Sequence, residues 1–305
     1  MIIPGPADLA ARYRISNASR FRLKDISPND SWGKRFKPIA GEMLKQGAKR
    51  MAQLQERLYA QDRWSVLLIF QAMDAAGKDG TIKHVMAGVN PQGCEVHSFK
   101  APSSEELDHD FLWRTSRLLP RRGHIGIFNR SYYEETLVVR VHQNILARQQ
   151  LPSELVTKNI WRERFEDINA YERYLSRQGV VIRKFFLHVS KEEQRQRFIE
   201  RIENQEKHWK FSPADVGERA HFAAYMSAYE DMIRHTSTEE APWFVVPADR
   251  KWFTRLVVSA VIIDAIQSID PRYPALDPKV EAEFKRLKTA LEAERPAVKK
   301  KVKKK

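Results

Sequence analysis

The sequence predicts a three-layer α/β fold, with helices on both faces of a central parallel sheet of about five strands. Strongly apolar runs of five to ten residues alternate with segments that have helical periodicity. Several of these helical segments exceed ten residues, which is long enough to cross from one parallel strand to the next. The chain has 305 residues, 42% of them hydrophobic, which suffices for a buried core of ordinary size.

The elements follow one another in regular order. Apolar residues recur at helical spacing between Met43 and Gln61, before an almost unbroken apolar strand at residues 64–70. Ser103, with Glu106 three residues later, is a typical helix N-cap, and Ser190 is a second. The remaining strands are expected at residues 94–99, 124–128, 180–189 and 243–247, and the remaining helices at residues 78–86, 103–118, 129–147, 152–177, 190–202, 217–235 and 252–269.

The last thirty residues differ in composition from the rest. Beyond Pro274 the chain consists mainly of Glu, Lys, Arg and Ala and ends in KKKVKKK. We expect residues 1–274 to form a single domain, and residues 275–305 to form a peripheral helix and a frayed lysine-rich end.

Charge and composition narrow the class of protein. The net charge is +14, and without the six lysines of residues 299–305 it is still +8, so the folded part should attract polyanions. Neither a signal peptide nor an apolar run of bilayer-spanning length is present, which predicts a cytoplasmic protein with no membrane partner. Cys94 is the only cysteine, which excludes an intramolecular disulfide and a cysteine zinc cluster.

The segment Ala72-Met-Asp-Ala-Ala-Gly-Lys-Asp-Gly80 follows the first strand and precedes a helix. This context predicts a P-loop, whose backbone N–H groups and lysine surround phosphate oxygens. Ala72 and Asp79 depart from the usual motif, because glycine and Ser/Thr are expected there. The alternative is an ordinary strand-to-helix turn with a solvated Lys78. The phosphate-binding residues predicted by the motif are Ala75, Ala76, Gly77, Lys78, Asp79 and Gly80.

Three further residues indicate phosphate chemistry. Asp74, inside the loop, is the predicted Mg²⁺ ligand because Asp79 replaces the usual hydroxyl; alternatively, it shapes the turn. Asn129 and Arg130 follow the third strand, where parallel sheets bind ligands. Arg130 is a candidate for stabilising a transferring phosphoryl group, although both residues could simply cap a helix.

A cationic run follows Ser190. Arg197 and Arg201 share one helix face, and Lys207 and Lys210 come shortly after. Such a run can form a mobile lid over phosphates, expected here at about residues 200–235, or it can be a solvated surface paired with neighbouring glutamates.

Together these stretches resemble the polyphosphate kinase 2 family, from about Gln55 to Pro274. The similar stretches are DAAGKDG, FKAPSSEELDHDFLWR, FNRSYYEE, SKEEQRQRF, KHWKFS and APWFVVPADRKW. The resemblance implies a thymidylate-kinase-like P-loop kinase fold with a helical lid, Mg²⁺ dependence, and phosphoryl transfer between inorganic polyphosphate and nucleoside mono-, di- and triphosphates. It also implies a homo-oligomer, either a dimer or a tetramer.

The resemblance assigns roles to individual residues. Asp74 and Lys78 match the essential residues of the loop, Arg130 matches the arginine after the third strand, and Lys100 matches a residue near the acceptor nucleotide. The cations that match the family's lid are Arg197, Arg201, Lys207 and Lys210. Asn129 and Glu134 depart from the family's FDRSWYN form and resemble the class III subgroup, which phosphorylates both nucleoside mono- and diphosphates.

Two other functions remain compatible with the sequence. An ATP-dependent kinase of a small metabolite would use the same loop without polyphosphate. A polyanion- or nucleic-acid-binding protein with an inert loop would account for the charge, but the sequence contains no recognisable RNA- or DNA-binding motif, so no specific nucleic acid partner is expected.

Overall fold

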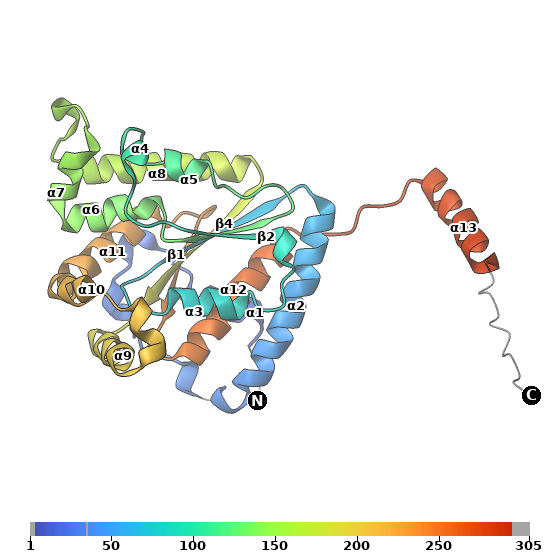
Figure 1. Cartoon of the computed structure of the whole chain (residues 1–305), viewed down its shortest axis with the longest axis horizontal. Coiled ribbons are helices and arrows are strands. Elements are labelled where there is room, and N and C mark those ends of the chain that lie inside the picture. Colours follow the sequence, from blue (N-terminus) through green and yellow to red (C-terminus); the bar gives the residue numbers. More distant parts are fainter. Residues whose placement is uncertain (1–3, 35, 295–305) are drawn as a thin grey trace, which may run out of the picture. The chain divides into compact units, whose positions relative to one another are not determined.

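The computed structural model describes residues 4–34 and 36–294, without the side chains of Lys34 and Lys210. The chain divides into two compact units, Met1–Arg272 and Tyr273–Lys305 (Figure 1). The first unit contains the sheet and the helices that cover it. In the second, the described part contains one helix, α13 (Pro278–Ala293), which has no buried residue. The lysine-rich end at residues 299–305 lies outside the described residues.

The first unit is built on a five-stranded sheet with the order β2-β3-β1-β4-β5, in which every pair of neighbours is parallel. The strands are β1 (Ser65–Gln71), β2 (Cys94–Ser98), β3 (Ile125–Asn129), β4 (Val180–His188) and β5 (Trp243–Pro247). This confirms the prediction of an α/β fold with a parallel sheet of about five strands. The chain leaves β1 in one direction and β3 in the other, so their carboxyl ends form the switch point at which such sheets bind ligands.

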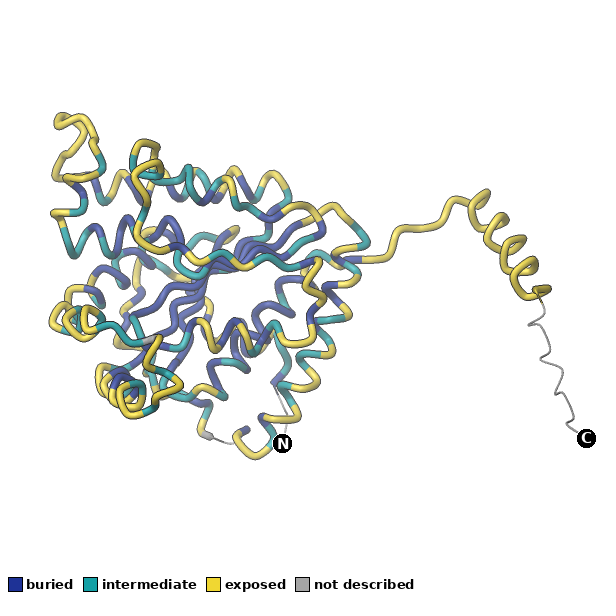
Figure 2. Tube along the Cα trace, viewed as in Figure 1, coloured by how far each residue is buried: buried dark blue, intermediate teal, exposed yellow. Residues whose placement is uncertain are grey.

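Helices cover both faces of the sheet, which explains the apolar character of its strands. All seven residues of β1 are buried (Figure 2). One face packs against α1 (Pro6–Tyr13), α2 (Ala40–Gln61), α3 (Lys78–Val85) and α12 (Lys251–Ser268), and the other against α6 (Val138–Val141), α8 (Ile160–Arg177) and α11 (Phe222–Thr236). Among the described residues, none of the helices is both long and apolar enough to cross a bilayer.

Two predicted caps are confirmed. Ser103 and Glu106 form a capping box at α4 (Ser104–Leu107), in which the Ser103 N–H donates to the Glu106 carboxylate at 2.8 Å. The Ser190 hydroxyl accepts the Glu193 N–H at 3.1 Å at the start of α9 (Lys191–Glu203).

Four helix predictions are wrong in their extent, and one of them is the helix expected at residues 217–235, which is a 3₁₀ turn (Glu218–His221) followed by α11 from Phe222. The helix expected at residues 103–118 is split into α4 and α5 (Trp113–Ser116), because the Asp110 carboxylate accepts the Leu112 N–H at 2.9 Å and forms a local turn instead. The segment after β3 is a 3₁₀ turn (Tyr132–Thr136), α6 and α7 (Gln143–Leu146). The helix expected from Pro152 begins only at Ile160. The short α10 (Pro213–Gly217) lies between α9 and α11.

Candidate active site

The turn after β1, residues 72–77, contains two left-handed backbone conformations. Ala75 has φ of 62° and Gly77 has φ of 102°. A side chain at position 77 would be strained at this φ, and its Cβ would lie 3.6 Å from Nη1 of Arg197. Gly77 is the N-cap of α3, so the turn brings its backbone to the N-terminus of a helix, where N–H groups and the helix dipole bind anions.

Lys78 points into the protein. Its side chain is buried, and Nζ donates to the carbonyl oxygen of Ala72 at 2.9 Å, across the turn. Burial lowers its pKa, although the carboxylate of Asp74 opposes this shift. The alternative of a solvated surface lysine is therefore wrong.

Helix α9 binds the backbone carbonyl groups of the turn through Arg197. Arg197, only 6% exposed, donates to the carbonyl oxygens of Ala75 (3.1 Å) and Ala76 (2.7 Å). It also donates to the carbonyl oxygens of Ala248 (2.6 Å) and Asp249 (3.3 Å) after β5, and to the carboxylate of Glu193 (2.8 Å). These five bonds occupy the donors of the guanidinium. The carbonyl groups of Ala75 and Ala76 therefore face α9, while the Ala76 N–H donates to the carbonyl oxygen of Met73 at 3.2 Å within the turn.

Gln194, also on α9, binds the same turn. The side-chain nitrogen of Gln194 donates to the carbonyl oxygen of Asp74 at 3.0 Å, and its oxygen accepts a bond from Arg219 at 2.8 Å. Three successive carbonyl groups of the turn, those of residues 74–76, are thus bound by α9 side chains.

The turn after β3 lies beside the turn after β1, because β1 and β3 are neighbours with Phe70 opposite Asn129. The Asn129 amide donates to the Asp79 carboxylate at 2.7 Å. An aspartate at position 129 could not donate this bond and would place a second negative charge beside Asp79. Arg130 donates to the Asp74 carboxylate at 2.8 Å.

Glu134 lies on the other side of Arg130. Its carboxylate is 3.9 Å from the guanidinium, and the Gln71 amide, turned so that its nitrogen faces the carboxylate, donates to it at 2.8 Å. Burial raises the pKa of Glu134, and the positive charges of Arg130 and Lys78 only partly offset this effect. Arg130 therefore connects a carboxylate of the P-loop with a partly buried carboxylate beyond β3.

Two cavities meet at this point, with Lys100 and Arg130 in the lining of both. The larger one, about 510 Å³, also includes loop residues 74–80, Asn129, Arg197, Arg201 and Lys207 in its lining. The smaller one, about 250 Å³, is mostly apolar and includes Glu134. The side chain of Lys210 lies outside the described side chains, so its position is not assigned. Every other residue predicted for the site lines one of the two cavities.

Several residues that line the larger cavity were not predicted from the sequence. Asp215 of α10 faces it, and burial together with the negative charge of Asp74 raises the pKa of Asp215. Lys251 and Trp209 also line it. Lys251 could have been found from its place just after β5, since parallel sheets bind ligands beyond their carboxyl ends; no comparable signal marked Asp215.

The donor set suits a cation that is also bound by phosphate. Among the described residues, no group of three or more His, Cys, Asp or Glu side chains is placed to hold a metal. Asp74 and Asp215 nevertheless offer two mutually repelling carboxylates to one cavity. One or two carboxylates combined with phosphate oxygens and water is the usual protein environment of Mg²⁺.

Known proteins share this chain's sequence and fold. An ADP-polyphosphate phosphotransferase of Rhodopseudomonas palustris is 52% identical over 251 residues, covering 82% of this chain and 87% of that protein. An AMP/ADP-polyphosphate phosphotransferase of Meiothermus ruber is 44% identical over 264 residues, covering 86% and 95%. The crystal structure of polyphosphate kinase 2 from Arthrobacter aurescens TC1 superimposes with a TM-score of 0.84 at 37% identity, covering 95% of this chain and 98% of that one.

The family model of polyphosphate kinase 2 matches residues 39–274, which include both turns, α9 and β5. The match therefore covers all the elements that line the two cavities. With its parallel sheet, its P-loop and these relatives, the chain belongs to the polyphosphate kinase 2 family.

Proposed function

We propose that the chain transfers phosphoryl groups between inorganic polyphosphate and nucleotides, in a direct in-line reaction at the P-loop. One observation carries the proposal: a large cavity lined by the loop and by cations meets a smaller, mainly apolar cavity at Lys100 and Arg130. A phosphate chain suits the first and a nucleoside the second, so their phosphates would meet beside Arg130. The names of the relatives from Rhodopseudomonas and Meiothermus support the same reaction.

In this proposal the phosphate chain binds in the larger cavity. The loop N–H groups and Lys78 bind the phosphate to be transferred, while Arg201 and Lys207 bind phosphates further along the chain. Lys207 is paired with Glu200 in the structure, so binding would exchange this partner for a phosphate. Lys210 keeps the same proposed role, and residues 200–235 are the proposed lid that excludes water.

The nucleotide is proposed to bind in the smaller cavity. Apolar side chains suit a base, and those in the lining are Leu107, Phe111, Val138, Val139 and Ile145. Lys100 and Arg130 lie where this cavity meets the larger one and would bind the nucleotide's phosphates. Glu134, in the same lining, is the proposed determinant of monophosphate acceptance.

Phosphoryl transfer depends mainly on alignment and charge neutralisation. Asp74 is held by Arg130 at 2.8 Å, which orients its carboxylate towards the attacking phosphate. Arg130 then stabilises the charge of the transferring group. Asp74, with Asp215 in the lining of the same cavity and the side-chain oxygen of Asn129 as a further neutral donor, would hold Mg²⁺, which when bound neutralises phosphate oxygens and aligns the two substrates.

The proposal also includes a cytoplasmic location and a dimer or tetramer, which cell fractionation and light scattering would test.

The activity test incubates the full chain with Mg²⁺, polyphosphate and either AMP, ADP or GDP, and separates the nucleotides by chromatography. ATP formed from ADP is the expected result, and ADP formed from AMP would support the role of Glu134. Transfer from ATP to a metabolite without polyphosphate, or polyphosphate and nucleic acid binding without any transfer, would instead support one of the two alternatives.

A further inference from the structure

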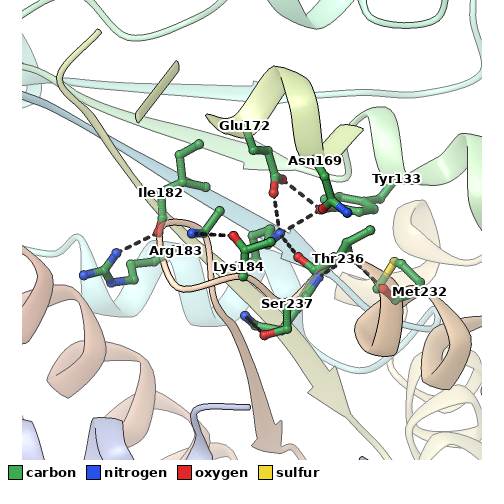
Figure 3. A network of polar contacts seen from close by, with 12 residues as sticks. Tyr133, Asn169, Glu172, Ile182, Arg183, Lys184, Met232, Thr236 and Ser237 are labelled. Carbon is green, nitrogen blue, oxygen red and sulfur yellow. Dashed lines mark hydrogen bonds and ion pairs between the residues drawn. The ribbon is translucent and has the colours of Figure 1, made fainter. Parts of the chain in front are cut away.

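A fully buried ion pair lies beneath the turn that carries Arg130. Lys184 of β4 is 0% exposed and Glu172 of α8 is 1% exposed, and the ammonium contacts the carboxylate at 2.5 Å (Figure 3). Neither residue lines either of the two cavities. The pair therefore does not touch substrate, and the proposed reaction leaves it without a role.

The pair is saturated with hydrogen bonds. Lys184 also donates to the hydroxyl of Tyr133 at 2.8 Å and to the carbonyl oxygen of Thr236 at 2.6 Å, which uses its three donors. The other oxygen of Glu172 accepts the hydroxyls of Tyr132 at 2.9 Å and Tyr133 at 2.8 Å. Two consecutive tyrosines are thus attached to one carboxylate.

These tyrosines directly follow the strained part of the site. Arg130 has φ of 64°, a left-handed conformation that is uncommon for a residue with a side chain. Its N–H donates to the carbonyl oxygen of Phe70 at 3.0 Å, which fixes it to β1 from one side. On the other side only Ser131 separates it from Tyr132. Such a backbone persists when the surrounding structure fixes it from both sides.

Stability alone does not account for a pair of this kind. Moving two charges out of water is costly, and apolar residues of similar volume are often equally stable or more stable. Apolar replacements would make contacts without a preferred direction and would not fix the orientation of the Tyr132 and Tyr133 rings. The hydrogen bonds from both hydroxyls to the Glu172 carboxylate do fix it. Glu134 comes immediately after these two residues, so the same attachment also restrains its backbone.

We propose that Lys184 and Glu172, acting through Tyr132 and Tyr133, are positioning residues that hold Arg130 in its left-handed conformation for phosphoryl transfer. This inference rests on the proposed function of Arg130. It makes the buried pair a determinant of kcat, with little effect on the binding of polyphosphate.

The first test replaces the pair together, Glu172→Leu with Lys184→Met, so that no unpaired charge is left buried. Circular dichroism and thermal unfolding should show a folded protein, while kcat should fall on the order of 10²-fold with the KM for polyphosphate changed less than about twofold. A milder variant, Tyr132→Phe, removes one hydroxyl and keeps the test valid if the double variant does not fold. Its kcat should fall several-fold, about fivefold or more.

Coupling to Arg130 separates positioning from a general structural effect. In an Arg130→Lys background, Tyr132→Phe should lower kcat by less than about twofold, because the group it positions is already altered. Hydrogen exchange provides a readout without catalysis: the amides of residues 130–134 should exchange faster in Tyr132→Phe, while those of β1 residues 65–69 remain unchanged. The matched control is Tyr13→Phe, which removes another buried hydroxyl bound to a carboxylate, that of Asp30 at 2.8 Å, and should leave kcat unchanged.

The outcomes distinguish a failure of the proposed function from a failure of the positioning role alone. A wild-type protein that transfers no phosphoryl group from polyphosphate would overturn the proposed function and this inference with it. If the wild type is active, two results would overturn the positioning role alone. One is an effect of Tyr132→Phe on kcat that is the same with Arg130 intact as in the Arg130→Lys background, and the other is an equal rise of exchange in β1.

Discussion

Replacing Arg197 with lysine tests how the P-loop is held. The substitution keeps the positive charge but reduces five donors to three, all on a single nitrogen. In the structure the guanidinium spans the carbonyl groups of Ala75 and Ala76 on one side and those of Ala248 and Asp249 on the other. We expect the ammonium to bind one of these pairs and to leave the other without a donor.

The expected losses of stability and activity follow from these contacts. A buried carbonyl group that loses its donor costs about 1–3 kcal/mol, so the loss of two bonds should lower the free energy of unfolding by roughly 2–6 kcal/mol. If the loop loses its support, its N–H groups no longer converge on phosphate, and kcat/KM for polyphosphate should fall on the order of 10²-fold.

The assay combines urea unfolding with steady-state kinetics at two salt concentrations. The matched control is Arg201→Lys, one turn further along α9 in the lining of the same cavity; its free energy of unfolding should change by less than about 0.5 kcal/mol. The reasoning is refuted if Arg197→Lys is as stable as wild type and only raises the KM for polyphosphate in a salt-dependent manner. Arg197 would then be a phosphate ligand, as the cationic run first indicated.

Three further changes have defined outcomes. Asp74→Asn should abolish transfer while circular dichroism stays unchanged, and a folded, fully active variant would contradict the proposed role. Glu134→Asn should lower the rate with AMP more than the rate with ADP in the same chromatographic assay; equal losses would disprove its part in acceptor choice. Burial lowers the pKa of His188 to about 4, against the opposing charge of Asp249. Because this lies below the unfolded value of about 6.5, the neutral ring contributes stability that is present above pH 6.5 and is lost as pH falls towards 4, roughly 3 kcal/mol in total. Urea unfolding at pH 7 and pH 4.5 should therefore show a smaller acid loss in His188→Asn than in wild type, and an equal loss would contradict the lowered pKa.

Much of the fold could be predicted from local patterns. The strands are short apolar runs because both faces of a parallel sheet are covered, and β1 and β5 were found for that reason. Helix boundaries were less accurate where a polar side chain binds nearby backbone, as Asp110 does between α4 and α5. Such competition is decided by a single contact, which periodicity does not reveal.

The candidate site could be predicted only in part from local sequence patterns. Motif position marked Asp74, Lys78 and Arg130, because a strand, a turn and a helix place phosphate ligands at known offsets. It did not indicate that Asn129 donates to Asp79, since these residues are 50 positions apart and meet only because β3 lies beside β1.

The sequence by itself determined the order of strands and helices, the loop that suits phosphate, and an excess of positive charge. Tertiary structure alone decided what each charged residue does. Arg197 belongs to a run of exposed charges by sequence, and Lys184 interrupts an apolar strand, yet both are buried and fully bonded. The physical reason is that a buried donor must find its acceptors, and those acceptors come from segments that are distant in the chain and are brought together only by folding.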